Sequence, residues 1–312
     1  MMMSKKAAPE KAPTKVNNCT QDKVVMVGLH IILAFILVVV IYPLLFVVFA
    51  SVSDPQYVNS GALLLYPKGF NLLGYQQVFR DQRILIGYAN TIYYTVFGTI
   101  LAVAVNMMAG YSLSRDDLPG RGIIMALFVF TMYFGGGMIP FYLIVRNLHL
   151  TNTRAILVLL GGTSVYNMII VRSFFVSTIP RELQEAAEID GCGIARFFVS
   201  IVMPLSKAIT AVIVLYCAVG QWNAYFNALI FISDRDKFPL QIFLREILLT
   251  AKTYESAEVL STLSGDDLAR MQRMSEVTKY GVIVVSTLPI IALYPFLQKY
   301  FVKGVMIGSL KG

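Results

Sequence analysis

Charged residues are scarce in this sequence, where Asp, Glu, Lys and Arg make up only 14% of 312 residues. A soluble domain carries roughly 25% charged residues. Hydrophobic residues reach 57%, and several windows of about 20 residues, the length that a helix needs to cross a bilayer, contain almost no charge. The composition therefore excludes an ordinary soluble domain and indicates a membrane protein with several spans.

Several chemical motifs are also missing. Cys19, Cys192 and Cys217 are an odd number of cysteines without paired spacing, so the sequence suggests neither a disulfide framework nor a cysteine metal cluster. His30 and His149 are isolated and belong to no recognisable nucleophilic or metal-binding motif. No Gly-rich phosphate loop ending in Lys-Ser or Lys-Thr is present, so the chain cannot hydrolyse ATP by that route. The net charge of +8 comes without an aromatic-basic motif, so we interpret it as cytoplasmic loop bias and expect no nucleic-acid partner.

Six apolar runs are long enough to cross a membrane, which predicts an all-α integral membrane fold. The first run is too long for the apolar core of a cleaved signal peptide, so we expect it to remain as a span. We expect a disordered N-terminus at 1–23, the first span with an external loop at 24–87, a core of five spans at 88–303, and a tail at 304–312. The six runs cover 24–50, 88–113, 122–145, 155–176, 205–232 and 280–300.

The distribution of positive charge sets the orientation of these spans. Five lysines precede the first span, and neither Lys nor Arg occurs between Val24 and Pro67. Because cytoplasmic loops are enriched in Lys and Arg, we expect both termini in the cytoplasm, together with the segment Pro180–Pro204. We also expect short helices outside the membrane at 71–79 and 263–274.

The segment Pro180–Pro204 lies between the fourth and fifth spans, and its residue pattern is that of an ordered helix and not of a loop. Pro180 suits the first turn of a helix, and Glu182 and Glu185 lie near its positive end. Gly191 supplies a stop signal. The pattern predicts a short amphipathic helix with a small-residue face, typical of a docking device, with a solvated acidic helix as the alternative.

The spacing within this segment resembles a known signature. Glu185-Ala186-Ala187, then Gly191, Ile201 and Met203-Pro204 resemble the EAA motif of permease subunits of ABC importers. The family pattern ends in Leu-Pro, so Met203 is a departure, although an apolar one of similar volume. Asp190 before the glycine fits the carbohydrate branch of the family.

Other stretches, within a resemblance from Gly74 to Gly312, are similar to oligosaccharide-type permeases of the maltose-transporter superfamily. The subset most similar imports polysaccharide-derived oligosaccharides or multiple sugars. The stretches are Phe134-Gly-Gly-Gly-Met-Ile-Pro140 with Thr151-Asn152-Thr153, Gln221-Trp222-Asn223 with Phe238-Pro239-Leu240, and Gln298 to Gly304 with Lys311-Gly312.

The resemblance implies a type I importer in a bacterial plasma membrane. Its partners would be a second homologous permease, two ATP-binding cassette ATPases, an extracytoplasmic solute-binding protein and a sugar substrate. The ATPases would use ATP and magnesium, while this chain would hold no cofactor or metal and catalyse no reaction. Its cytoplasmic EAA helix, between spans four and five, would be the coupling helix.

The predicted ATPase-coupling residues have separate roles. The alanines allow close approach to a groove, Glu185 supplies a charge contact, and Gly191 permits the positive φ of a sharp bend. The full set is Glu182, Glu185, Ala186, Ala187, Asp190, Gly191, Ile201 and Pro204.

Polar and aromatic residues within the spans are candidates for the substrate path, since the bilayer disfavours polar groups that face lipid. Side-chain amides suit a neutral polyhydroxyl cargo, and aromatic rings can stack on sugar rings. The alternative is hydrogen bonding between helices. The candidates are Tyr133, Asn167, Gln221, Trp222, Asn223 and Asn227.

Three further questions have more than one answer. Gly135 to Gly137 with Pro140 form either a broken helix beside a cavity or a close packing site with a kink, and we favour packing. The charged stretch Ser233–Lys279 either contacts the solute-binding protein or is simply solvated. For the function we expect import of an oligosaccharide or related sugar; the alternatives are import of another small polar solute and, more distantly, a channel or scaffold without ATPases.

Overall fold

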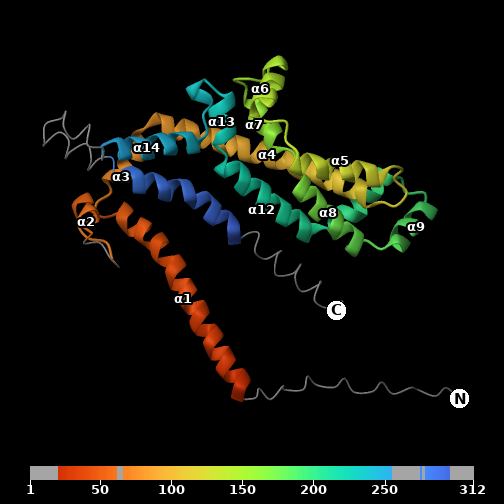
Figure 1. Cartoon of the computed structure of the whole chain (residues 1–312), viewed down its shortest axis with the longest axis horizontal. Helices are drawn as coiled ribbons and strands as arrows, with labels where there is room; N and C mark the ends of the chain where they lie inside the picture. The colour runs from red at the N-terminus through yellow and green to blue at the C-terminus, as the bar shows by residue number, and fades with distance from the viewer. Residues whose placement is uncertain (1–19, 62–65, 255–274, 276–277, 296–312) are drawn as a thin grey trace.

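The computed structural model describes residues 20–61, 66–254, 275 and 278–295 (Figure 1). Within these ranges every regular element is a helix and no strand occurs, which confirms the all-α prediction. The predicted tail at 304–312 and the predicted helix at 263–274 lie outside the described residues, as do most of the predicted N-terminal segment and the end of the last predicted span.

The helices follow one another with short connections. In chain order they are α1 (Thr20–Ser51), α2 (Pro55–Asn59), α3 (Leu73–Arg80), α4 (Gln82–Ser114), α5 (Arg121–Tyr133), α6 (Met138–Asn147), α7 (Arg154–Gly161), α8 (Val165–Thr178), α9 (Arg181–Ile189), α10 (Ile194–Phe197), a π-helix (Phe198–Val202), α11 (Met203–Leu205), α12 (Lys207–Asn223), α13 (Phe226–Phe231), a 3-10 turn (Arg235–Lys237) and α14 (Leu240–Tyr254). A last described helix spans Thr278–Pro295.

Helix α4 is the central element, and α7, α8, α12 and α14 all pack against it. Its N-terminus is capped by Asp81, whose carboxylate accepts from the Arg83 amide. Close packing depends on missing side chains: a Cβ at Gly98 of α4 or at Gly161 of α7 would collide with the side chain of Gln221 on α12. Because these two glycines have no side chain, α4 and α7 can both pack directly against the Gln221 side chain of α12.

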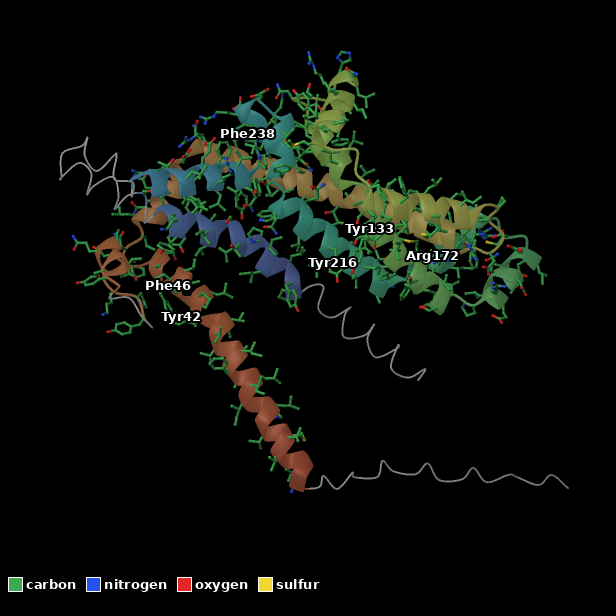
Figure 2. All side chains as sticks on the ribbon, in the orientation of Figure 1. Tyr42, Phe46, Tyr133, Arg172, Tyr216 and Phe238 are labelled. Atoms are coloured by element: carbon green, nitrogen blue, oxygen red, sulfur yellow. The ribbon has the colours of Figure 1, made fainter. Side chains whose placement is uncertain are left out.

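Helix α1 stands apart from the other helices and carries exposed apolar side chains along most of its length (Figure 1). Its contact with the remaining helices lies near its C-terminal end, where the ring of Phe46 meets Tyr280 edge-on at 6.2 Å (Figure 2). The apolar span begins at Lys23, close to the predicted start, but the helix begins at Thr20, so the last residues of the segment expected to be disordered are helical. An apolar helix of this length without cover is suited to lipid or to a partner chain.

Three single helices are long and apolar enough to cross a membrane: Lys23–Ser51, Gln82–Ser114 and Thr278–Pro295. Three bent pairs qualify if each is taken as one span: α5 with α6 at 112°, α7 with α8 at 42°, and Ile194–Leu205 with α12 at 84°. The run at 122–145, which we expect to be interrupted by its glycines, is a broken helix that ends at Tyr133 and resumes at Met138. The run expected at 205–232 is also interrupted, after Asn223.

The break between α5 and α6 coincides with the three glycines. Gly137 has a φ of +84°, which an L side chain rarely adopts. A Cβ at Gly135 or Gly136 would meet nothing within 4 Å, so these glycines are not packing sites against the described residues. The preferred interpretation, a packing site with a kink, is therefore confirmed only for the bend: the backbone forms a broken helix, and Gly135 and Gly136 pack against none of the described residues.

Candidate functional site

Helix α9 exposes a stripe of four residues that share one face. Glu182, Glu185, Ala186 and Ile189 are spaced i, i+3, i+4 and i+7, and all four are exposed. The stripe combines two carboxylates, one small residue and one apolar residue. Ile189 is 87% exposed. Its helix is too short to span a membrane, so a membrane crossing does not explain the exposed apolar side chain. The stripe therefore has the composition of a contact surface.

The opposite face of α9 anchors the helix to the rest of the chain. Ala187 is buried at 7% exposure and joins a core cluster that includes Phe197 and Val202, with Leu183 packed against it. Of the two alanines predicted to face a partner, only Ala186 is exposed. The prediction for Ala187 is corrected accordingly: its small side chain serves close packing inside this chain.

Gly191 ends α9 in the manner predicted for a sharp bend. Its φ is +70°, its amide donates to the carbonyl of Glu188 at 3.0 Å, and the amide of Cys192 donates to the carbonyl of Ala187 at 2.8 Å. These two bonds form a Schellman motif, which satisfies the last carbonyls of the helix. Since a Cβ on Gly191 would meet nothing within 4 Å, glycine is needed here for its backbone conformation and not for space.

The remaining coupling candidates lie around this bend. Asp190 is the exposed C-cap residue of α9, and Pro204 is exposed in α11. Ile201 is half-buried in the π-helix and packs against the same core as Ala187. Ile201 therefore supports the segment from inside, whereas Asp190 is open to a partner.

The loop after α4 contacts α9 through charged groups. Arg115 pairs with Asp117 and approaches Glu188, while Asp116 pairs with Arg181 at the start of α9. The Arg115 guanidinium holds the pKa of the Asp117 carboxyl below its usual range, and the same hydrogen bonds raise the pKa of Arg115. Sequence reasoning missed this loop, because the paired residues are far apart in the chain.

A groove of about 890 Å³ lies between α8, α12 and the last described helix, a size suited to small molecules. Its walls are mostly apolar, with one amide and three tyrosines as polar groups; Tyr216 is labelled on α12 in Figure 2. The lining residues are Tyr166, Asn167, Leu215, Tyr216, Val219, Gly220, Ile290, Ile291, Tyr294 and Pro295. An apolar groove with aromatic rings and few polar groups suits the C–H faces and hydroxyls of a sugar.

Only one predicted path residue, Asn167, lines this groove; its amide lies 3.6 Å from the Cys217 sulfur. Gln221 is wedged between two glycines, with its amide nitrogen 3.4 Å from the Leu157 carbonyl. Sequence reasoning missed the tyrosines, although Tyr166 directly precedes Asn167 and Tyr216 is one helical turn before Val219 and Gly220.

The other path candidates are scattered. Trp222 is 4% exposed, donates to the carbonyl of Ser286 at 2.9 Å and packs edge-on against Tyr88. Its ring is thus closed to a sugar in this structure. Asn223 is exposed and donates to its own helix, Asn227 is half-buried in α13, and Tyr133 is exposed at the end of α5 (Figure 2). The six candidates therefore do not form one site.

Comparisons with known proteins give consistent relatives. No family model matches the chain. Protein LplC of Bacillus subtilis is 38% identical over 274 residues, which cover 88% of this chain and 90% of that protein. The polygalacturonan/rhamnogalacturonan transport system permease protein YtcP of the same organism is 38% identical over 285 residues, covering 90% and 96%.

One solved structure agrees with these relatives. A chain of a bacterial ABC transporter involved in the import of the acidic polysaccharide alginate superposes with a TM-score of 0.79 at 29% identity. The match covers 92% of this chain and 100% of that one. The similarity thus includes nearly the whole helical arrangement described above.

Proposed function

Because this chain belongs to the permease subunits of carbohydrate ABC importers, we propose that it forms half of a translocation path for an oligosaccharide. A second, homologous permease supplies the other half. Two ATP-binding cassette ATPases, which bind ATP and magnesium, drive the cycle from the cytoplasm, and an extracytoplasmic solute-binding protein delivers the sugar. This chain itself carries out no chemistry.

The observation that carries this proposal is the exposed stripe on α9. A groove on the ATPase that accepts this stripe needs a basic group for Glu185 and an apolar socket for Ile189. Ala186 between them lets the helix lie close to the groove floor. Because Ala187 and Leu183 fix the other face to the core, a push on α9 moves the permease rather than the helix alone.

The proposed topology has six crossings, with both termini in the cytoplasm of a bacterial cell. Helix α1, α4 and the last described helix each cross once, and the pairs α5 with α6 and α7 with α8 supply two more crossings. The remaining crossing is the run at 205–232, which contains α12 and α13. Pro180–Pro204 then faces the cytoplasm between the fourth and fifth crossings, and the division into 1–23, 24–87, 88–303 and 304–312 follows from this topology. Four lysines before α1, together with Lys23 in its first turn, support the orientation.

The proposed cargo is an oligosaccharide derived from a polysaccharide. Two relatives are named for polygalacturonan or rhamnogalacturonan and for alginate, which supports this substrate class. The groove beside Asn167 supplies tyrosine rings and one amide, groups that bind hydroxyls and C–H faces. We assign the groove, rather than the full set of six candidates, to the path.

The proposal is tested by ATP-dependent uptake into proteoliposomes that contain the complete importer. Labelled pectin-derived and alginate-derived oligosaccharides are offered with the binding protein outside and with ATP and magnesium at the ATPases. We expect accumulation of at least one of these sugars only in the presence of ATP. Equilibration without ATP would favour a channel, and accumulation of a non-sugar solute alone would favour another polar substrate.

A further inference from the structure

A cluster of charged residues joins the loop after α4 to both ends of α9. Arg115, the C-cap residue of α4, donates to the two carboxylate oxygens of Asp117 at 2.8 and 2.5 Å. The same guanidinium lies 3.5 Å from the carboxylate of Glu188, 73 residues away in the last turn of α9. At the first turn of α9, Arg181 pairs with Asp116. The loop therefore fixes α9 relative to α4, to which α9 has no direct chain connection.

Arg115 is buried to an unusual degree for a charged residue outside the membrane. Its side chain is 9% exposed, whereas its two acidic partners are more than half exposed. A third partner is Tyr111, whose hydroxyl accepts from Arg115 at 3.2 Å and whose ring lies 5.9 Å from the guanidinium carbon. A buried charge is costly unless it is paired and hydrogen-bonded, and here several partners hold it in one place.

Tyr111 extends this link into the core. Its ring meets Phe175 of α8 edge-on at 5.8 Å and Phe198 of the π-helix at 5.0 Å. Tyr111, Phe175 and Ala187 belong to one buried cluster, with Phe198 packed against it. The guanidinium thus joins Glu188 in the last turn of α9 to Tyr111 near the C-terminal end of α4.

We propose that Arg115 is a positioning residue that transmits displacement of α9 to α4. We call the group of Tyr111, Arg115, Asp117 and Glu188 the Arg115 clamp. The inference rests on the proposed function, in which an ATPase moves α9. Along the chain α9 connects only to α8 and α10, so its link to α4 consists of the clamp, the Asp116–Arg181 pair and the core packing of Ala187. Of these contacts, the clamp is the one that joins the end of α9 to the C-cap residue of α4.

Helix α4 is suited to receive such a displacement at its C-terminal end. Arg172 of α8 donates to the Leu113 carbonyl at 3.0 Å and so binds one of the last free carbonyls of α4 (Figure 2). Gly110 permits contact with Val171 of α8, and Gly98 permits contact with Gln221 of α12. A shift at the clamp therefore reaches α12, which lines the groove, through packed contacts.

The same helix offers a matched control. Arg83 in the first turn of α4 makes a bidentate pair with Asp81, two residues away, as Arg115 does with Asp117. Among the described residues, the hydrogen bonds of the Arg83 side chain stay within this pair. Arg83→Gln removes only the local ion pair with Asp81 and leaves α9 unaffected. Arg115→Gln removes the local ion pair with Asp117 and also the contacts with Glu188 and Tyr111 that complete the clamp.

The test uses hydrogen exchange in the complete importer, free of nucleotide and trapped with ATP, magnesium and vanadate. In the wild-type protein we expect trapping to change amide exchange in α9 and in residues 110–121. In the Arg115→Gln variant we expect the change in α9 to remain and the change at 110–121 to fall by about threefold to tenfold. Arg83→Gln should behave as wild type, and Arg115→Lys should restore part of the response because it keeps the charge but loses the planar fork.

Two negative results are distinguishable. If trapping leaves α9 unchanged in the wild-type protein, both the docking of α9 and the transmission are refuted. If α9 responds and residues 110–121 respond equally in Arg115→Gln and in wild type, only the transmission is refuted. Co-purification of the ATPases with each variant checks that the complex has assembled, and a variant that fails this check is replaced by Tyr111→Phe, which removes one clamp contact and keeps the buried ring.

Discussion

Ile189 is an apolar residue that the core of this chain leaves uncovered. It is 87% exposed on the outer stripe of α9, and burial of such a side chain is the main gain that an apolar socket can offer. Ile189→Ala removes three carbons. If they are fully buried at the ATPase, we expect association to weaken by about 2 kcal/mol, or roughly thirtyfold in dissociation constant.

Titration of the permease complex with purified ATPase measures this loss. Ile189→Leu is the control, because it keeps the apolar volume and should bind within about threefold of wild type. Since the side chain is exposed in the permease alone, neither variant should change the thermal stability of the permease without ATPase. Unchanged affinity of Ile189→Ala would show that the socket does not exist.

The bend at the C-terminal end of α9 depends on the backbone conformation of Gly191. At a φ of +70°, a β-branched residue costs about 1–2 kcal/mol, whereas asparagine tolerates this region better. We therefore expect Gly191→Val to disturb the bend and to lower sugar-stimulated ATPase activity several-fold, with membrane insertion intact. Gly191→Asn should retain most of the stimulation.

Gly193 provides the control for added bulk near this bend. It has ordinary backbone angles, with a φ of −67°, and a Cβ there would also meet nothing within 4 Å. Gly193→Val should therefore leave stimulation near the wild-type value in the reconstituted importer. Equal losses in Gly191→Val and Gly193→Val would mean that bulk at the surface, and not the bend, is responsible. Normal stimulation in Gly191→Val would contradict the coupling role of α9.

Elements whose signals are local were predictable from the sequence, and those that depend on distant contacts were not. Helix α9 has its start and stop residues within a dozen positions, so Pro180 and Gly191 predicted its bounds. The glycines before Pro140 marked a special backbone, yet glycine permits both a break and close packing, and only the spatial arrangement decided for the break. The Arg115 clamp joins residues 73 positions apart, and no local pattern marks such a pair.

The groove shows the same limit for the candidate path. Its lining comes from α8, α12 and the last described helix, and each helix contributes a tyrosine that looks like any span aromatic in the sequence. Trp222 and Gln221 were singled out because they are polar or aromatic within a span, but both serve packing between helices. Polar residues in spans thus indicate contact with protein in general. Only their position in the structure shows whether they pack between helices or line the substrate path.

The molecule as a whole is a set of helices in which bent pairs must cross the membrane if the chain is to have six spans. The pair α5 and α6 is the critical one, because its bend of 112° would also fit a re-entrant pair that returns to the same side. If the pair crosses, Asn147 at the end of α6 lies outside the cell, whereas a re-entrant pair leaves it in the cytoplasm. Ala195 in α10 is exposed and lies in the proposed cytoplasmic segment.

Single cysteines in a variant without Cys19, Cys192 and Cys217 decide between these topologies. In intact cells we expect a membrane-impermeant maleimide to label Asn147→Cys and Ser233→Cys but not Ala195→Cys. In inverted vesicles the order should reverse, because the cytoplasmic face is then accessible. Protection of Asn147→Cys and Ser233→Cys in cells, together with labelling of Ala195→Cys, would make α5 and α6 a re-entrant pair, because every later crossing would then have the opposite orientation.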